Sequence, residues 1–378
     1  MSRGSRVLLF CRKDKFMLYQ QIRRKTHPVQ VGRVGIGGSH LLPIQSMTNT
    51  DTHDREATLA QVRALAAAGC DIVRLAIPDR EAAETVGYIK EKLPEMPLVA
   101  DIHFDYRIAL ACVEQGVDKI RINPGNIGGE DRVRAVCDAC AARHIPIRIG
   151  VNSGSLEKSI LARHGAPTPA ALCESALYHA ALLERCDFRD IVISIKASNV
   201  PDMIAANRLV AAACEYPLHL GVTEAGSENM GMIKSAAGIG ALLCDGIGDT
   251  LRVSLTADPI REVAAARKIL AAVDMEEQRG LDLICCPTCG RTKIDLIPLV
   301  ARFEEAVAAE GLDQLPLKVA LMGCVVNGPG EAREADLGIA GGVGEAVLFT
   351  HGQIIDRISE ADIIPRLIAE LKAKQKSL

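Results

Sequence analysis

Aromatic residues are scarce in this 378-residue chain: tryptophan is absent, and Phe, Trp and Tyr together make up only 3%. Such a composition leaves little from which to build the platforms on which bases or sugars stack. The net charge of −3 provides no basic face, which excludes a typical nucleic-acid-binding protein. No apolar run approaches the roughly 18 residues of a membrane span, and the VLLF stretch is too short for a signal-peptide core. We therefore expect a cytoplasmic protein with no nucleic-acid partner and no membrane partner.

The cysteine content indicates reduced thiols. The chain has 13 Cys, an odd number, and most of them stand singly within apolar stretches. In a chain without a secretory signal, this is typical of cytosolic thiols, some of which can bind a metal.

Between Pro43 and Ala272, short β-rich runs alternate with helical runs. Several of the β-rich runs are nearly continuously apolar, as expected for strands that are buried on both faces. The strand candidates begin at Pro43, Asp71, Pro97, Lys119, Pro146, Asp190, Pro217 and Thr250. The helical runs between them, such as EATLAQVRALAAAG, place apolar residues at i, i+3 and i+4. These successive β–α units predict an α/β protein with a closed (β/α)8 TIM barrel at residues 21–272.

A short motif recurs where three of these strands begin. Glycine, aspartate, apolar residues and arginine follow one another in GCDIVR, GVDKIR and GIGDTLR. This recurrence predicts that the successive units share one turn design.

The pattern changes after Val273. The polar stretch EEQRGLDL predicts a linker at residues 273–281. Strand, helix and strand candidates follow, and then a Gly-rich turn, two short strands and a terminal helix. They predict a small α+β domain at residues 282–378, which is large enough to fold around its own core. Residues 1–20 lack periodic apolar positions and are interpreted as a disordered leader, of which the residues before Met17 are expected to be dispensable.

The second domain carries a metal-binding pattern. Cys286 and Cys289 form a Cys-x-x-Cys turn at the end of its first strand, and Cys324 ends a later strand. Two thiolates from such a turn and a third from a neighbouring strand end can reach one metal centre. The alternatives are buried structural thiols, a dithiol redox pair, which has no use for Cys324, and a structural zinc site, whose fourth ligand in this domain could only be His351. The pattern favours an iron–sulfur cluster with an unusual fourth ligand.

Two other cysteine patterns are interpreted differently. Cys137 and Cys140 form a second Cys-x-x-Cys, but inside the helical run GGEDRVRAVCDACAAR, which favours packing in the core. Cys285 adjoins Cys286 but points to the opposite face of its strand, so it cannot easily share the same metal.

Polar residues gather at the carboxyl ends of the predicted barrel strands, where barrel enzymes have their active sites. They are Asp101, His103, Arg121, Asn123, Arg148, Asn152, Lys196, Ser198, Thr223, Glu224, Arg252 and Ser254. Three arginines and a lysine in a partly desolvated mouth repel one another unless an anion neutralises them. A small diphosphate fits, because arginine forks bind phosphate oxygens in pairs. Arg74 lies earlier along its strand and is interpreted as structural.

Several longer motifs occur in order along the chain: QSMTNT, VADIHFDYRIAL, RINPGNIG, PIRIGVNSGSLEK, GVTEAG, GIGDTLRVSL, CPTCGR and GCVVNGPGEA. Together they resemble the 4-hydroxy-3-methylbut-2-enyl diphosphate synthase family in its bacterial two-domain form, from about Gln21 almost to the C-terminus. The resemblance implies reduction of 2-C-methyl-D-erythritol 2,4-cyclodiphosphate to (E)-4-hydroxy-3-methylbut-2-enyl diphosphate in the non-mevalonate isoprenoid pathway. It also implies that the second domain resembles the cluster domain of sulfite and nitrite reductases.

The same resemblance implies a cofactor, a reductant and residue roles. A [4Fe–4S] cluster would be held by Cys286, Cys289, Cys324 and Glu331, and would receive electrons from flavodoxin or ferredoxin. Arg121, Arg148 and Lys196 would cradle the diphosphate. The residues around the carbon skeleton would be Asp101, His103, Asn152, Thr223, Glu224 and Ser254. Glu224 would give a proton to the leaving hydroxyl, and Glu331 would serve in catalysis as the fourth cluster ligand.

One departure from the family pattern lies after the first barrel strand. Some members place a further diphosphate-binding arginine there. This chain has TDTHDREAT, which offers Asp51, His53 and Arg55, and the sequence does not distinguish among the three.

We also expect a homodimer in which each active site is shared between two chains. The last barrel helix, from Pro259 to about Ala272, runs antiparallel to the strands and ends at the bottom of the barrel. The polar ring lies at the top, roughly 25–30 Å away. The linker spans at most about 30 Å and would have to climb over the outer helices. The cysteine domain is therefore expected to reach the barrel of a partner chain.

Two functions of other classes remain open from the sequence. A Schiff-base aldolase could use Lys196 on the sixth strand, although the cysteine motif would then have no purpose. A zinc-stabilised binding module would be colourless, whereas an iron–sulfur protein absorbs broadly at about 400 nm.

Overall fold

The structure is a computed structural model that describes residues 22–275, 280–326, 330 and 332–377. The predicted leader at residues 1–20, part of the predicted linker, and Glu331 lie outside the described residues. The chain divides into two units, Met1–Glu276 and Glu277–Leu378.

Parallel strands form a ring in the described part of the first unit. They are β3 (Gln45–Met47), β4 (Ile72–Ala76), β5 (Leu98–Asp101), β6 (Lys119–Ile122), β7 (Ile147–Asn152), β8 (Ile191–Lys196), β9 (His219–Leu220) and β10 (Thr250–Leu251). Strands β3 to β8 pair in sequence order, and β9 pairs with β10. Single parallel bridges, Ile193 to Leu218 and Ile44 to Leu251, join the two sheets at both of their edges. The predicted closed barrel is therefore confirmed.

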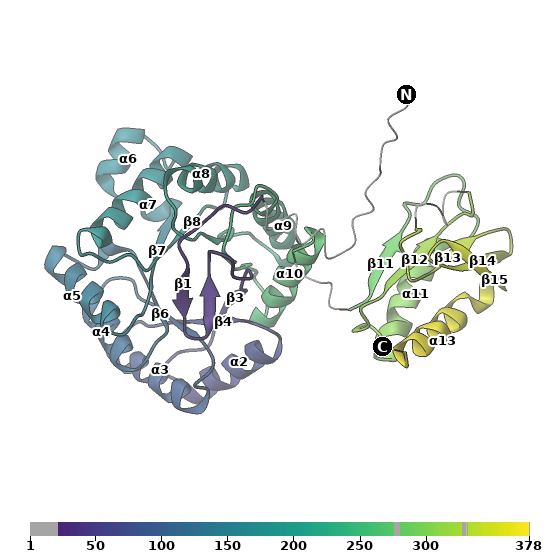
Figure 1. Cartoon of the computed structure of the whole chain (residues 1–378), viewed down its shortest axis with the longest axis horizontal. Coiled ribbons are helices and arrows are strands. Elements are labelled where there is room, and N and C mark those ends of the chain that lie inside the picture. The colour runs from purple at the N-terminus through teal and green to yellow at the C-terminus, as the bar shows by residue number, and fades with distance from the viewer. Residues whose placement is uncertain (1–21, 276–279, 327–329, 331, 378) are drawn as a thin grey trace, which may run out of the picture. The chain divides into compact units, whose positions relative to one another are not determined.

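Helices surround this ring (Figure 1). They are α2 (Arg55–Ala67), α3 (Arg80–Lys92), α4 (Tyr106–Glu114), α5 (Glu130–Ala141), α6 (Lys158–His164), α7 (Pro169–Glu184), α8 (Val200–Ala213), α9 (Glu228–Cys244) and α10 (Pro259–Ala272). Several begin at a short polar side chain that accepts a backbone N–H of the first turn, as Asp54 and Asp79 do. Such caps satisfy N–H groups that have no partner inside the helix, and so determine where each βα loop ends. No helix in the described residues of either unit is long and apolar enough to cross a membrane.

The recurring Gly-Asp motif makes the same contact in three barrel units. Each aspartate carboxylate accepts a backbone N–H near the start of the neighbouring strand. The pairs are Asp71 with Ile44 (2.8 Å), Asp118 with Leu98 (2.8 Å) and Asp249 with Leu218 (2.9 Å). The predicted shared turn design is confirmed.

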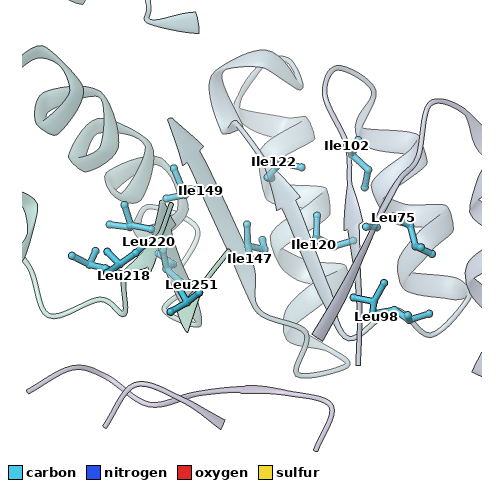
Figure 2. Packing of buried hydrophobic residues seen from close by; sticks show 14 of the residues in the cluster. Leu75, Leu98, Ile102, Ile120, Ile122, Ile147, Ile149, Leu218, Leu220 and Leu251 are labelled. Atoms are coloured by element: carbon cyan, nitrogen blue, oxygen red, sulfur yellow. The ribbon is translucent and has the colours of Figure 1, made fainter. Parts of the chain in front are cut away.

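Side chains alternate between two environments along the barrel strands. Ile120 and Ile122 are fully buried in the main hydrophobic core, between the strands and the helices (Figure 2). The residues that alternate with them, Lys119 and Arg121, lie on the opposite, inner face of the strand. The apolar core therefore lies outside the ring, and charged side chains enter its interior.

A hairpin of β1 (Val29–Val31) and β2 (Val34–Ile36) packs against one end of the barrel. Its Val31 joins a small apolar cluster with Ile72 and Val99. Because Ile72 is the first residue of β4, the hairpin covers the amino-terminal end of the ring. The sequence pattern did not predict this hairpin.

The second unit is a five-stranded sheet with helices, in the order β11-β12-β13-β14-β15. Its elements are β11 (Asp282–Cys285), α11 (Leu296–Ala309), β12 (Lys318–Met322), β13 (Leu337–Gly341), β14 (Glu345–Thr350), β15 (Gln353–Ser359) and α13 (Ile363–Gln375). Strands β11 to β13 are parallel, and β14 and β15 are antiparallel additions. Phe303 of α11 and Leu367 of α13 share one core with the sheet. The α+β architecture was predicted, but the edge strand β15, most of whose residues are exposed, was not.

Candidate active site and candidate metal centre

The strand register brings predicted polar residues of four neighbouring strands together. The Cα atoms of Asp101 and Arg121 are paired, and so are those of Arg121 and Arg148. Further along, Asn152 of β7 is paired with Lys196 of β8. Asp101, Arg121 and Arg148 therefore lie side by side across β5 to β7, and Asn152 and Lys196 form a second pair four residues further along β7.

Asp101 is the carboxylate at the centre of this group. Arg121 Nη1 donates to its Oδ1 at 2.9 Å, and Arg74 Nε lies 3.6 Å from its Oδ2. His103 Nε2 lies 3.9 Å from the same oxygen. Burial by itself raises the pKa of Asp101, but the neighbouring arginines outweigh this effect and hold the pKa at about 2. Asp101 is therefore ionised at any physiological pH.

Arg74 belongs to this group, although the sequence analysis interpreted it as structural. It is buried, and its Nη2 donates to Met47 Sδ at 2.7 Å in addition to its contact with Asp101. Burial lowers the pKa of Arg74 to about 10, against the opposing charge of Asp101. The sequence alone does not indicate this contact, because it depends on strand register: Arg74 stands two residues before Ala76, whose Cα is paired with that of Asp101, so Arg74 and Asp101 face the same side of the sheet.

Positive charge exceeds negative charge among the described residues of the barrel interior. Arg148 and Lys196 are buried, and burial together with neighbouring guanidinium groups lowers the pKa of both well below their ordinary values. Lys119, which was not predicted, is fully buried, and its Nζ has no hydrogen-bond partner within the described ranges. Buried like charges with few counter-ions are costly. The interior therefore suits an anionic ligand that supplies the missing negative charge.

Two glycines make room for these cations. The guanidinium of Arg121 lies over Gly150 of β7, where a Cβ would stand 2.4 Å from Nε. The amine of Lys196 lies over Gly221, where a Cβ would stand 2.9 Å from Nζ and 2.6 Å from the carbonyl oxygen of Arg252. A side chain at Gly150 would have to displace Arg121, and one at Gly221 would have to displace both Lys196 and the backbone at Arg252.

Arg252 is held differently from the other predicted cations. Its Nε and Nη2 each lie 3.2 Å from a carboxylate oxygen of Glu262 in α10. The same carboxylate accepts hydrogen bonds from Ser46 Oγ at 3.0 Å and from the N–H of Leu255 at 3.1 Å. This bidentate pair neutralises Arg252 and ties β10 to α10. Glu262 was missed because nothing in a helix sequence marks a carboxylate that reaches toward the strands.

Asn123, Ser198 and Ser254 follow the ends of their strands. Asn123 Oδ1 accepts the N–H of Gly125 at 3.1 Å and so caps the short 3-10 turn that begins at Pro124. Ser198 and Ser254 are half-buried. Their roles in substrate binding stay predictions.

Glu224 stands in the loop after β9 with a φ of +50°. A residue other than glycine in this left-handed region costs on the order of 1 kcal/mol and is held there by its surroundings. The preceding residue, Thr223, donates its N–H to the carbonyl of Ala197 at 3.4 Å. The side chain of Glu224 is exposed, and its role as a proton donor stays a prediction.

A cavity of about 240 Å³ lies beside Asp101 and His103. It is lined by Thr50, Asp51, Thr52, Ala76, Ile77, Pro78, Asp101 and His103. Among the three candidates for the extra phosphate contact, Asp51 lines this cavity and also accepts a hydrogen bond from His53 Nδ1 at 2.8 Å. Arg55 instead lies over the ring of Tyr88, with its Cζ 5.2 Å from the ring centre.

The predicted cysteine ligands follow two neighbouring parallel strands of the second unit. Cys286 directly follows β11, and its Sγ accepts the N–H of Gly323, the residue before Cys324, at 3.1 Å. Hydrogen bonds from Arg291 lower the pKa of the exposed Cys289, which favours the thiolate that metals bind. Within the described residues, no three His, Cys, Asp or Glu side chains are gathered closely enough to hold a metal ion. The cysteines fit a cluster in donor type and in strand-end position, and the complete ligand set stays a prediction.

The second Cys-x-x-Cys pattern belongs to the core, as predicted. Cys137 and Cys140 are 1% and 0% exposed in α5. Burial raises the pKa of both thiols, to about 12 for Cys140, which makes them poor metal ligands.

Together, these features define a barrel protein whose cationic interior suits a phosphorylated ligand, joined to a separate cysteine-bearing domain. Two family models match the chain in the same order: the GcpE TIM-barrel domain at residues 26–267 and the GcpE protein C-terminal domain at residues 282–373. The chain belongs to the GcpE family.

Full-length relatives agree with this assignment. The 4-hydroxy-3-methylbut-2-en-1-yl diphosphate synthases (flavodoxin) of Ruminiclostridium cellulolyticum and Clostridium perfringens are each 55% identical, over 92% of this chain and 98% of their own. The protein of the same name from Geobacter sulfurreducens is 54% identical, over 93% of this chain and 98% of its own. The predicted family is confirmed, and the aldolase and zinc-module alternatives are not favoured.

Proposed function

We propose that this chain converts 2-C-methyl-D-erythritol 2,4-cyclodiphosphate into (E)-4-hydroxy-3-methylbut-2-enyl diphosphate and water, with uptake of two electrons and two protons, in isoprenoid biosynthesis. The observation that carries the proposal is the excess positive charge of the barrel interior, where Arg121, Arg148 and Lys196 converge. A cyclic diphosphate supplies the negative charge that this interior lacks. The activity named for full-length relatives supports the same conclusion.

The residues of the barrel would act by binding and orienting the substrate. Arg121 and Arg148 would contact diphosphate oxygens, and Asp101 would hold the guanidinium of Arg121 in place through their 2.9 Å hydrogen bond. A bound diphosphate would favour the protonated form of Lys196, because its negative charge opposes the effects of burial and of the cationic neighbours that lower the Lys196 pKa. Glu224 would donate a proton to the leaving hydroxyl.

Cys286, Cys289, Cys324 and Glu331 would hold a [4Fe–4S] cluster in a domain that resembles the cluster domain of sulfite and nitrite reductases. When bound, the cluster would supply the two electrons one at a time. The name of the relatives, which includes flavodoxin, supports flavodoxin as the reductant, with ferredoxin as the other candidate. The lowered pKa of Cys289 supports a thiolate ligand at that position.

The functional unit would be a homodimer in which the cysteine domain of one chain closes the barrel of its partner. A complementation experiment tests this arrangement, using an Arg148→Ala chain and a Cys289→Ser chain mixed under conditions of subunit exchange. A mixed pair would contain one site with both lesions and one site with neither, so activity should return. Demonstrated exchange without any return of activity would contradict the shared site.

The proposed reaction is tested with anaerobically purified, full-length protein. We expect broad absorption at about 400 nm and turnover of the cyclic diphosphate with reduced flavodoxin. Arg148→Ala should lower kcat/KM, by an amount that corresponds to about 2–4 kcal/mol of lost transition-state stabilisation. The reason is that the substitution removes one partner of the desolvated charge pair between Arg148 and the diphosphate. The control is Arg208→Ala, which removes an exposed arginine that is paired with Asp245 on the outer surface. Cluster-loaded protein without turnover, or equal kcat/KM for both variants, would contradict the proposal.

A further inference from the structure

The loop that follows β7 is attached to α7 through a partly buried carboxylate. Glu157, five residues after Asn152, accepts hydrogen bonds from Ser175 Oγ at 2.7 Å and from His179 Nε2. Ser175 and His179 are both fully buried. Because α7 packs against β7 and β8, the carboxylate connects this loop to the wall of the barrel.

His179 also supports the loop that follows β6. A Cβ on Gly125 would stand 2.7 Å from His179 Cε1, so the imidazole packs directly against the turn that begins after Asn123. Burial lowers the pKa of His179 against the opposing charge of Glu157, so the ring is neutral. Its single proton then lies on Nε2, where the carboxylate accepts it. One rigid ring therefore contacts both loops.

We propose that Glu157 and His179 are positioning residues for the diphosphate site. They fix the loop that begins directly after Asn152 and the loop that carries Asn123, without contacting the substrate themselves. This inference rests on the proposed function, because its consequence is measured as binding and turnover of the cyclic diphosphate. A group displaced by about 1 Å can lose up to roughly 10²-fold in rate, so a loop released from α7 should weaken the site strongly.

The chain offers a matched control for this pair. Glu174 of α7 forms a similar His–Glu contact, with its Oε2 2.6 Å from His164 Nε2 in α6, and it also pairs with Arg163. Its side chain is 39% exposed, whereas that of Glu157 is 19% exposed. Loss of Glu174 therefore removes a more exposed His–Glu pair, between α6 and α7.

The experiment uses cluster-loaded, full-length protein and measures kcat and KM for the cyclic diphosphate. Glu157→Ala should raise KM and lower kcat/KM by roughly ten- to a hundredfold. Glu157→Gln, which keeps an oxygen for His179, should restore most of this loss, and Glu174→Ala should match the wild type. Gly125→Ala, which moves the imidazole but leaves the carboxylate in place, should also raise KM. This variant keeps the test decisive if Glu157→Ala does not fold.

A double-mutant cycle separates positioning from a general structural role. If Glu157 acts through Asn152, Glu157→Ala should cost little more in kcat/KM when Asn152→Ala is already present. Additive losses, or a wild-type KM in both Glu157→Ala and Gly125→Ala, would overturn the inference. Absence of turnover in the wild type and in Glu174→Ala would instead count against the proposed function, so the two failures are distinguishable.

Discussion

Asp101→Asn is the most direct test of the charge balance in the barrel interior. The substitution preserves the size of the side chain and removes the carboxylate that faces Arg74 and Arg121. The pKa of Asp101 is about 2 in the folded protein, compared with an ordinary value of 3.8. At about 1.36 kcal/mol per pH unit, this difference corresponds to roughly 2–3 kcal/mol of folding stability at neutral pH.

The sign of the pH dependence follows from the direction of this pKa shift. Because the folded pKa of Asp101 is below the unfolded value, its contribution is fully present above an unfolded pKa of about 4. The contribution is lost as the pH falls through the folded pKa of about 2. We therefore expect the Asn variant to be less stable than the wild type at neutral pH, with a gap that narrows on acidification.

Urea unfolding followed by tyrosine fluorescence measures this effect in the barrel unit. The chain has no Trp, and all 5 of its tyrosines precede Pro217. Inorganic pyrophosphate should stabilise the Asn variant at least as much as the wild type, because an anion replaces the lost negative charge. Asp138→Asn, on the exposed face of α5, is the control and should leave stability unchanged. Wild-type stability of Asp101→Asn at neutral pH would refute the reasoning.

The metal centre and the glycine contacts give further predictions. Cys324→Ser should abolish most of the iron content and the absorption at about 400 nm, whereas Cys137→Ser should keep both, and iron analysis of the two proteins distinguishes them. A full iron complement in Cys324→Ser would remove it from the ligand set. Gly221→Ala should lower kcat/KM by roughly tenfold or more, because its Cβ would stand 2.6 Å from the carbonyl oxygen of Arg252 and 2.9 Å from Lys196 Nζ. Gly129→Ala is its control, since a Cβ there meets nothing within 4 Å, and equal kinetics of the two variants would contradict the contact.

Local patterns in the sequence predicted much of this protein. The β–α alternation predicted the barrel, and the change of pattern after Val273 predicted a second α+β domain. The Gly-Asp motif of Asp71, Asp118 and Asp249 predicted a shared turn, which the carboxylate contacts confirm. Each of these signals lies within a few consecutive residues, because periodicity and turn chemistry are local properties. The longer motifs also identified the family.

Only the tertiary structure decided which charges meet. Arg74 and Asp101 are 27 positions apart, yet the register of β4 and β5 brings them within 3.6 Å. No partner for Arg252 is evident along the chain. In the fold, its Nη2 lies 3.2 Å from Oε1 of Glu262. Lys119, whose Nζ has no hydrogen-bond partner among the described residues, became apparent only when the inner face of the ring was defined. Electrostatic balance depends on distances across strands and helices and on burial from water, and neither quantity is contained in the order of residues along a single strand.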